Sequence, residues 1–88
     1  MITCTTNPAS APGGTVLREY IVHKIGSPVE DIVADSPERF RIIEAEALRD
    51  LIVMSEVSGA DASVIISPET LENPDCGRLI SGHCVLIP

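Results

Sequence analysis

The sequence predicts an α+β fold in which one long helix (about 37–57) and a short helix pack on a small, mainly antiparallel three-stranded sheet. Two patterns lead to this expectation. Apolar residues recur every three or four positions through residues 37–57, as in an amphipathic helix. β-branched residues dominate residues 62–67 and 79–87, as in strands. With 88 residues the chain has room for one domain, which we expect to span residues 15–88.

The first part of the chain predicts little regular structure. Residues 3–14 are small or polar, and they contain two prolines and a Gly-Gly pair. Such residues interrupt helices and strands. We therefore expect residues 1–14 to form a flexible N-terminal arm.

Residues 15–25 fit either a strand or a helix. As a helix they align Leu17, Ile21 and Ile25 at four-residue steps, and Gly26 then ends the helix. As a strand they place apolar side chains on both faces. We favour the strand, because two C-terminal strands alone make a weak sheet and a third strand gives the long helix a platform.

A Ser-Pro pair followed by a carboxylate occurs three times. The serine hydroxyl accepts a hydrogen bond from a free amide of the first helical turn, and proline fits the first helical position. The pairs Ser27-Pro28, Ser36-Pro37 and Ser67-Pro68 therefore predict helices over about 28–34, 37–57 and 68–72.

The long helix has more apolar residues than one buried stripe needs. The stripe consists of Phe40, Ile43, Ala47, Leu51 and Met54, and Gly59 ends the helix. Further apolar residues widen this face: Ile42, Ile52, Val53 and Val57. The helix is therefore either covered on two sides or partly exposed as a docking surface. Charged residues three apart, Arg41/Glu44 and Glu46/Arg49, have the spacing of weak ion pairs.

The C-terminal third predicts two strands. Residues 62–67 and 79–87 are rich in valine and isoleucine. The intervening Asn73-Pro74-Asp75 is typical of a turn, and Gly82 indicates a bulge.

Composition excludes several classes of function. Thirteen acidic side chains against six Lys and Arg give a net charge of −7, which opposes binding to a phosphate backbone. A single Tyr and a single Phe cannot form a base-stacking platform. No apolar run approaches the length of a membrane span, and the opening residues do not have the pattern of a secretory signal. Three cysteines without framework spacing are typical of reduced thiols. We therefore expect a cytoplasmic protein.

The cysteine and histidine residues do not predict a metal site or a nucleophile. Cys76 and His83 are seven residues apart, whereas zinc ligands come in pairs two to four apart. In a strand, His83 and Cys84 point to opposite faces. A pairing of Cys84 with His23 across strands lacks a third, orienting group. We expect no enzymatic activity, no cofactor and no metal.

A helix-turn-helix over residues 17–34 is an alternative interpretation. If 15–25 is a helix, residues 28–35 take the place of the recognition helix. That segment carries Glu30, Asp31 and Asp35 and no basic residue, so its carboxylates would face phosphates.

The charge is unevenly distributed along the chain. Residues 30–75 contain twelve acidic side chains and three arginines, a net charge of −9. A concentrated negative field speeds association with basic surfaces. We therefore expect a protein-binding module, an inhibitor or regulator that occupies a basic surface of a larger partner, such as a surface that binds nucleic acid, as phage-encoded inhibitors such as anti-CRISPR proteins do. The candidate partner-binding residues are Glu30, Asp31, Asp35, Glu38, Glu44, Glu46, Asp50 and Glu56.

A second function class is a homodimer or accessory subunit. Its interface would combine the spare apolar helix face of Ile42, Ile52, Val53 and Val57 with the edge strand 79–87.

Overall fold

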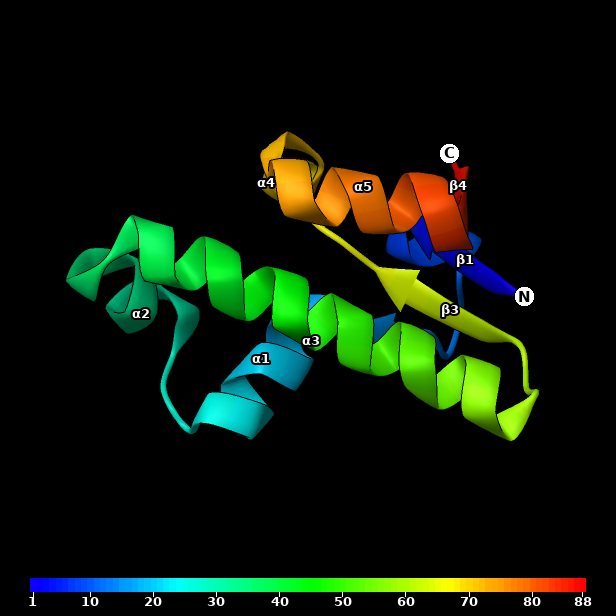
Figure 1. Cartoon of the computed structure of the whole chain (residues 1–88), viewed down its shortest axis with the longest axis horizontal. Coiled ribbons are helices and arrows are strands. Elements are labelled where there is room, and N and C mark those ends of the chain that lie inside the picture. Colours follow the sequence, from blue (N-terminus) through cyan, green and yellow to red (C-terminus); the bar gives the residue numbers. More distant parts are fainter.

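The computed structural model describes all 88 residues and contains five α-helices and a four-stranded, all-parallel sheet (Figure 1). The strand order is β2-β3-β1-β4. The strands are β1 (Ile2–Thr5), β2 (Thr15–Val16), β3 (Ala62–Ile65) and β4 (Cys84–Ile87). The helices are α1 (Leu17–Ile25), α2 (Val29–Asp35), α3 (Pro37–Ser58), α4 (Pro68–Glu72) and α5 (Pro74–His83), and a 3-10 turn, η1 (Pro8–Ser10), follows β1. The expectation of a mainly antiparallel three-stranded sheet is wrong.

Helices fill two of the three connections between consecutive strands, and residues 6–14 with the turn η1 form the third. The chain passes through α1, α2 and α3 between β2 and β3, and through α4 and α5 between β3 and β4. A helical crossover returns the chain to the edge of the sheet where the previous strand began, so the next strand runs in the same direction. Short turns join antiparallel neighbours, whereas the connections that lead to β3 and β4 contain helices.

The central strand β1 lies in the segment that was expected to be a flexible arm. Each of its four residues is paired with one residue of β3 and one of β4. Ile2 and Cys4 belong to the core, so Thr3 and Thr5 point to the other face of the sheet. This alternation is the sequence signal of the strand. It covers only four residues, and the prolines and glycines that follow it dominate the composition of the segment.

Residues 15–25 are mostly helical. The first two form β2 and the other nine form α1, on which Leu17 and Ile21 are buried. Gly26, in the left-handed conformation at φ 81°, ends the helix and donates its amide to the Val22 carbonyl at 2.8 Å. The four-residue spacing of the apolar side chains is therefore the pattern that matches the structure of this segment, because it buries one side of a helix.

The predicted strand 79–87 is also mostly helical. α5 continues through its first five residues, and only the last four form β4. Cys76 and Ile80, four residues apart, are buried along α5. The Asn73 side-chain oxygen accepts a hydrogen bond from the Asp75 amide at 3.1 Å. The predicted turn at Asn73-Pro74-Asp75 is thus the start of a helix.

α3 is the longest element, one residue longer than the sequence predicts. The Ser36 hydroxyl accepts a hydrogen bond from the Arg39 amide at 3.2 Å, and Gly59 follows the last turn at φ 71°. The predicted stripe is buried except for Met54, which is half-exposed. Ile52, which was expected on a spare apolar face, is 2% exposed and belongs to the core, because α5 packs along α3 as well.

The helices and the sheet enclose one core of sixteen buried residues. In Figure 1, α3 runs across the front of the molecule, with α1 on one side of it and α5 on the other. Residues 6–14, with η1, follow the carboxyl end of β1, and the Ser10 hydroxyl donates to the Pro88 carbonyl at 2.6 Å. No helix of the structure is both long enough and apolar enough to cross a membrane.

Candidate functional site

The candidate site comprises eight carboxylates on α2 and α3, and one of them, Glu44, is buried. Its side chain is 2% exposed. Its Oε2 accepts a hydrogen bond from the Thr70 hydroxyl at 3.0 Å, and its Oε1 accepts one from the Asn73 amide nitrogen at 3.0 Å. The Cys76 thiol lies 3.9 Å from Oε1. Glu44 therefore joins α3 to α4 and α5 and cannot contact a partner.

The helical position of Glu44 explains its burial. It follows the buried Phe40 by four residues and precedes Leu48 by four, so the turn of α3 directs it toward the interior. Thr70 and Asn73 meet it there, because Ser67 and Thr70 form the capping box of α4 and Asn73 caps α5. The sequence signal was available: Glu44 lies on the same side of the helix as the apolar stripe.

Three of the other candidate carboxylates form ion pairs. Asp35 Oδ2 lies 3.8 Å from Arg39, and Glu56 Oε1 lies 3.2 Å from His83 Nδ1. Asp50 pairs with Lys24, and this hydrogen bond raises the pKa of the lysine ammonium. These pairs are exposed and contribute little to stability. The pairs with Arg39 and Lys24 neutralise part of the negative charge that the sequence places on residues 30–75.

Four candidate carboxylates have no cationic partner within the chain: Glu30, Asp31, Glu38 and Glu46. Glu30 and Asp31 lie in the first turn of α2, and Glu38 lies in the first turn of α3. The positive end of a helix stabilises carboxylates at these positions. Glu30, Asp31, Asp35 and Glu38 form a surface that we call the acidic corner.

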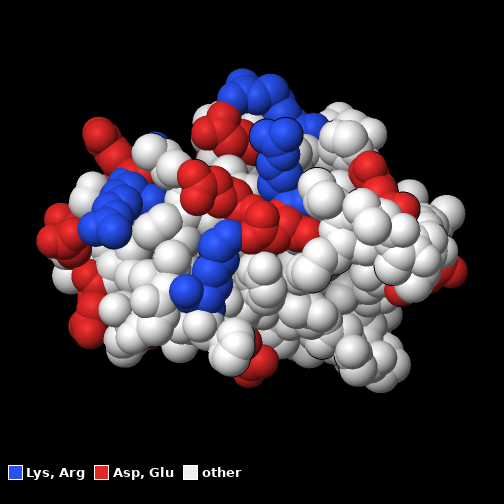
Figure 2. Space-filling view, turned by 60° about the horizontal axis from the view of Figure 1, so that its bottom comes forward, with Lys and Arg blue, Asp and Glu red and all other residues white.

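Figure 2 shows how the charges are distributed over one face of the molecule. Acidic groups gather at its left end, where α2 and the first turns of α3 lie. Toward the centre, acidic and basic side chains alternate, and the right side of the view shows scattered acidic groups without basic ones. The charge of −9 is therefore not one continuous face. Within the acidic corner, Asp35 is paired with Arg39, whereas Glu30, Asp31 and Glu38 have no cationic partner.

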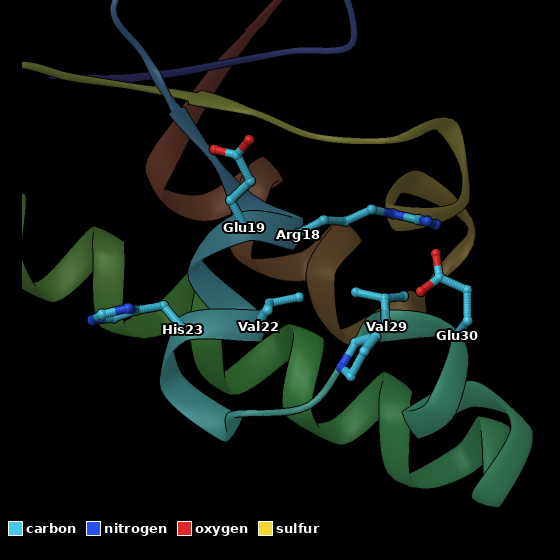
Figure 3. Close-up of a pocket in the computed structure, with 7 residues that line it drawn as sticks. Arg18, Glu19, Val22, His23, Val29 and Glu30 are labelled. Carbon is cyan, nitrogen blue, oxygen red and sulfur yellow. The ribbon is translucent and has the colours of Figure 1, made fainter.

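A groove of about 440 Å³ between α1 and α2 adjoins the acidic corner (Figure 3). Val22 and Val29 face each other across it, and Glu30 and Arg18 extend toward the same end of it. His23 points away from the space between the valines. This arrangement fits an aliphatic side chain between polar rims. The remaining lining residues are Glu19 and Pro28.

The α1–α2 unit resembles a helix-turn-helix only in its order of elements. The exposed side of α2 presents Glu30, Asp31 and Asp35. Carboxylates in the position of a recognition helix repel the phosphates of DNA. The charge of α2 therefore disfavours this function.

The three cysteines are free and shielded. Burial raises the pKa of the Cys4 and Cys76 thiols to about 12, and it raises the pKa of the Cys84 thiol as well. The structure brings no group of three His, Cys, Asp or Glu side chains together in a geometry that holds a metal ion. Neither His83 nor His23 forms a hydrogen bond with a thiol: His83 pairs with Glu56, and His23 lies exposed on α1.

We expect the native protein to resist thiol reagents. At pH 8 a thiol with a pKa of about 12 is thiolate in about one molecule in 10⁴, whereas an unfolded cysteine with a pKa near 8.5 is thiolate in about one in four. Ellman's reagent should therefore react with Cys4 and Cys76 at least about a hundredfold faster in denaturant than in native buffer. Equal rates in the two solutions would show that these thiols are not buried.

No family model, curated protein or solved structure matches this chain.

Proposed function

We propose that the protein is a small, non-enzymatic protein-binding module whose acidic corner docks on a basic surface of a larger partner. One observation carries the proposal. Glu30, Asp31 and Glu38 are exposed together at one corner without a cationic partner, whereas Asp50 and Glu56 are paired and the unpaired Glu46 lies apart from the corner on α3.

The position of these carboxylates favours association. They extend from the first turns of two consecutive helices, so the backbone holds them close together and the helix ends stabilise their charge. Arginine and lysine side chains of a partner can approach them without first displacing an ion pair. Such charges chiefly raise the association rate and the specificity of a complex.

The groove between α1 and α2 supplies the apolar part of the same surface. Protein interfaces combine an apolar centre with a polar rim. Val22 and Val29 provide such a centre, and Glu30 belongs both to the groove and to the acidic corner. An aliphatic side chain of the partner would fill the groove while its basic residues meet the carboxylates.

A partner whose basic surface normally holds nucleic acid would be inhibited by occupation. This is the mode of action of phage-encoded inhibitors such as anti-CRISPR proteins, and we extend it to this chain on physical grounds alone. The protein itself would bind neither nucleic acid nor membrane. We place it in the cytoplasm, where three free cysteines stay reduced.

Affinity capture from the native host lysate tests the proposal. The wild-type chain should retain a protein with a basic surface, and a variant with Glu30→Gln, Asp31→Asn and Glu38→Gln should retain at least about tenfold less of it. Raising the salt from about 50 to about 500 mM should release the retained protein from the wild type. Quantitative mass spectrometry of the eluates gives both ratios.

A matched variant controls for the loss of charge. Glu72→Gln, Asp61→Asn and Asp75→Asn together remove the same three charges outside the acidic corner and outside the groove, and they should leave the capture unchanged. Circular dichroism confirms that both variants are folded, since each change at a helix start costs only about 0.5 kcal/mol. Equal capture by the two triple variants, or capture that is insensitive to salt, would contradict the proposal.

A further inference from the structure

The exposed side of α3 carries six residues at alternating spacings of three and four. We call them the outer stripe: Arg39, Ile42, Glu46, Arg49, Val53 and Glu56. Ile42 is 56% exposed and Val53 is 47% exposed. The spacing is that of the a and d positions of a heptad, through which one helix packs against another. In Figure 1, α3 lies at the front of the molecule, and neither α1 nor α5 crosses it.

The outer stripe is complementary to itself when it is read in the reverse direction. Its first residue, Arg39, then meets its last, Glu56; Ile42 meets Val53; and Glu46 meets Arg49. Two copies of α3 packed antiparallel about a two-fold axis midway along the stripe make these contacts, and the symmetry produces each of them twice. Every charged residue of the stripe then faces an opposite charge, and every apolar residue faces an apolar one.

The central charges of the stripe are available for such contacts. Glu46 and Arg49 are three residues apart, yet they form no ion pair with each other or with any other residue of the chain. Arg39 and Glu56 hold only exposed partners, at 3.8 and 3.2 Å, which a second copy can replace at little cost.

A few apolar side chains lie beside the stripe. Ile42 lines a groove of about 390 Å³ between α3 and α5 together with Ala45 and Leu79, and the other lining residues of this groove are charged: Glu46, Arg49, Asp75 and Arg78. Val57, which is 83% exposed, follows Val53 by one helical turn. Each copy thus offers apolar side chains near both ends of the stripe, where the two-fold axis places Ile42 against Val53.

We propose that this chain forms a two-fold dimer in which the outer stripes of two α3 helices pack antiparallel. The inference goes beyond the proposed function, since it uses another surface and another partner. A single pair of helices buries less than the roughly 1,200 Å² of a stable complex, so the dimer dissociates on dilution. It carries its two acidic corners at opposite ends, because each corner lies at the N-terminal end of an α3.

Sedimentation velocity over protein concentrations from about 5 to about 500 µM tests the dimer. The wild type should shift from monomer to dimer within this range. Glu46→Arg and Arg49→Glu each place two pairs of like charges at the centre of the interface and should weaken association about a hundredfold. The double variant, which exchanges the two charges, should associate within about threefold of the wild type.

The control is Glu72→Arg, which changes the net charge as Glu46→Arg does but lies on α4, outside the stripe. It should dimerise like the wild type. A wild type that stays monomeric throughout the range would overturn the proposal. The same holds if the single variants dimerise like the wild type, or if the charge exchange fails to restore association in a folded double variant.

Discussion

Replacing Glu44 with alanine is expected to lower the free energy of unfolding by about 3 kcal/mol. The change removes the acceptor of the Thr70 hydroxyl and of one Asn73 side-chain N–H in a buried site, while the Asn73 side chain keeps its hydrogen bond to the Arg41 carbonyl. Each unsatisfied buried group costs about 1–3 kcal/mol. A domain of this size is stabilised by only about 4–13 kcal/mol, so the loss is a large fraction of the total. Urea unfolding followed by circular dichroism measures it.

Glu46→Ala is the matched control for this prediction. It makes the same chemical change two residues further along α3, at an exposed side chain that has no partner in the chain. At low protein concentration it should change stability by less than about 0.5 kcal/mol. If the two variants lose the same stability, Glu44 does not hold α3 to α4 and α5.

Replacing Ile52 with alanine is expected to cost about 3 kcal/mol, whereas replacing its neighbour Val53 should cost less than about 0.5 kcal/mol. Ile52 is 2% exposed and belongs to the core. Truncating it removes apolar contacts and leaves a cavity that the surrounding side chains fill only in part. Val53 is 47% exposed on the outer stripe and leaves no cavity.

Thermal unfolding of the two variants gives this difference directly. The melting temperature should fall by about 12–24 °C for Ile52→Ala and by no more than about 4 °C for Val53→Ala. A larger fall in melting temperature for Val53→Ala than for Ile52→Ala would mean that α3 is rotated about its axis relative to this structure.

The positions of the helices that begin with Ser-Pro pairs could be predicted from local chemistry. α2, α3 and α4 begin within one residue of the predicted positions, because proline and serine act within the first turn and need no tertiary partner. Local sequence patterns could not predict the sheet. β1 and β2 have four residues and two, too few for a pattern, and both depend on hydrogen bonds to β3, more than forty residues away along the chain.

The charge of the candidate site was predictable from the sequence, and so in part was the exposure of its residues. Counting carboxylates gave the acidic region without separating Glu44, which faces Thr70, from Glu46, which faces solvent, although Glu44 lies on the side of the apolar stripe. The difference is one of helix phase and of what packs on each side of α3. The start of α5 determines the difference, because Asn73 and Cys76 approach Glu44 where the sequence predicted a turn at residues 73–75 and a strand only from residue 79.

The two proposed surfaces reinforce each other. The two acidic corners of the dimer are separated by roughly the length of α3, about 30 Å at 1.5 Å per residue. A partner with repeated basic sites at that separation would bind both corners, and the second contact would form at a high effective concentration. A partner with one basic site would bind one corner only.

The central claim for the dimer is that the outer stripes of two α3 helices bind each other, and mixing two single variants tests it most directly. Glu46→Arg and Arg49→Glu should each be monomeric alone, whereas an equimolar mixture should form a one-to-one heterodimer in which every charge at the two-fold centre meets its opposite. Native mass spectrometry resolves the heterodimer from both homodimers. A mixture that stays monomeric, or that forms homodimers as readily as heterodimers, would contradict the account.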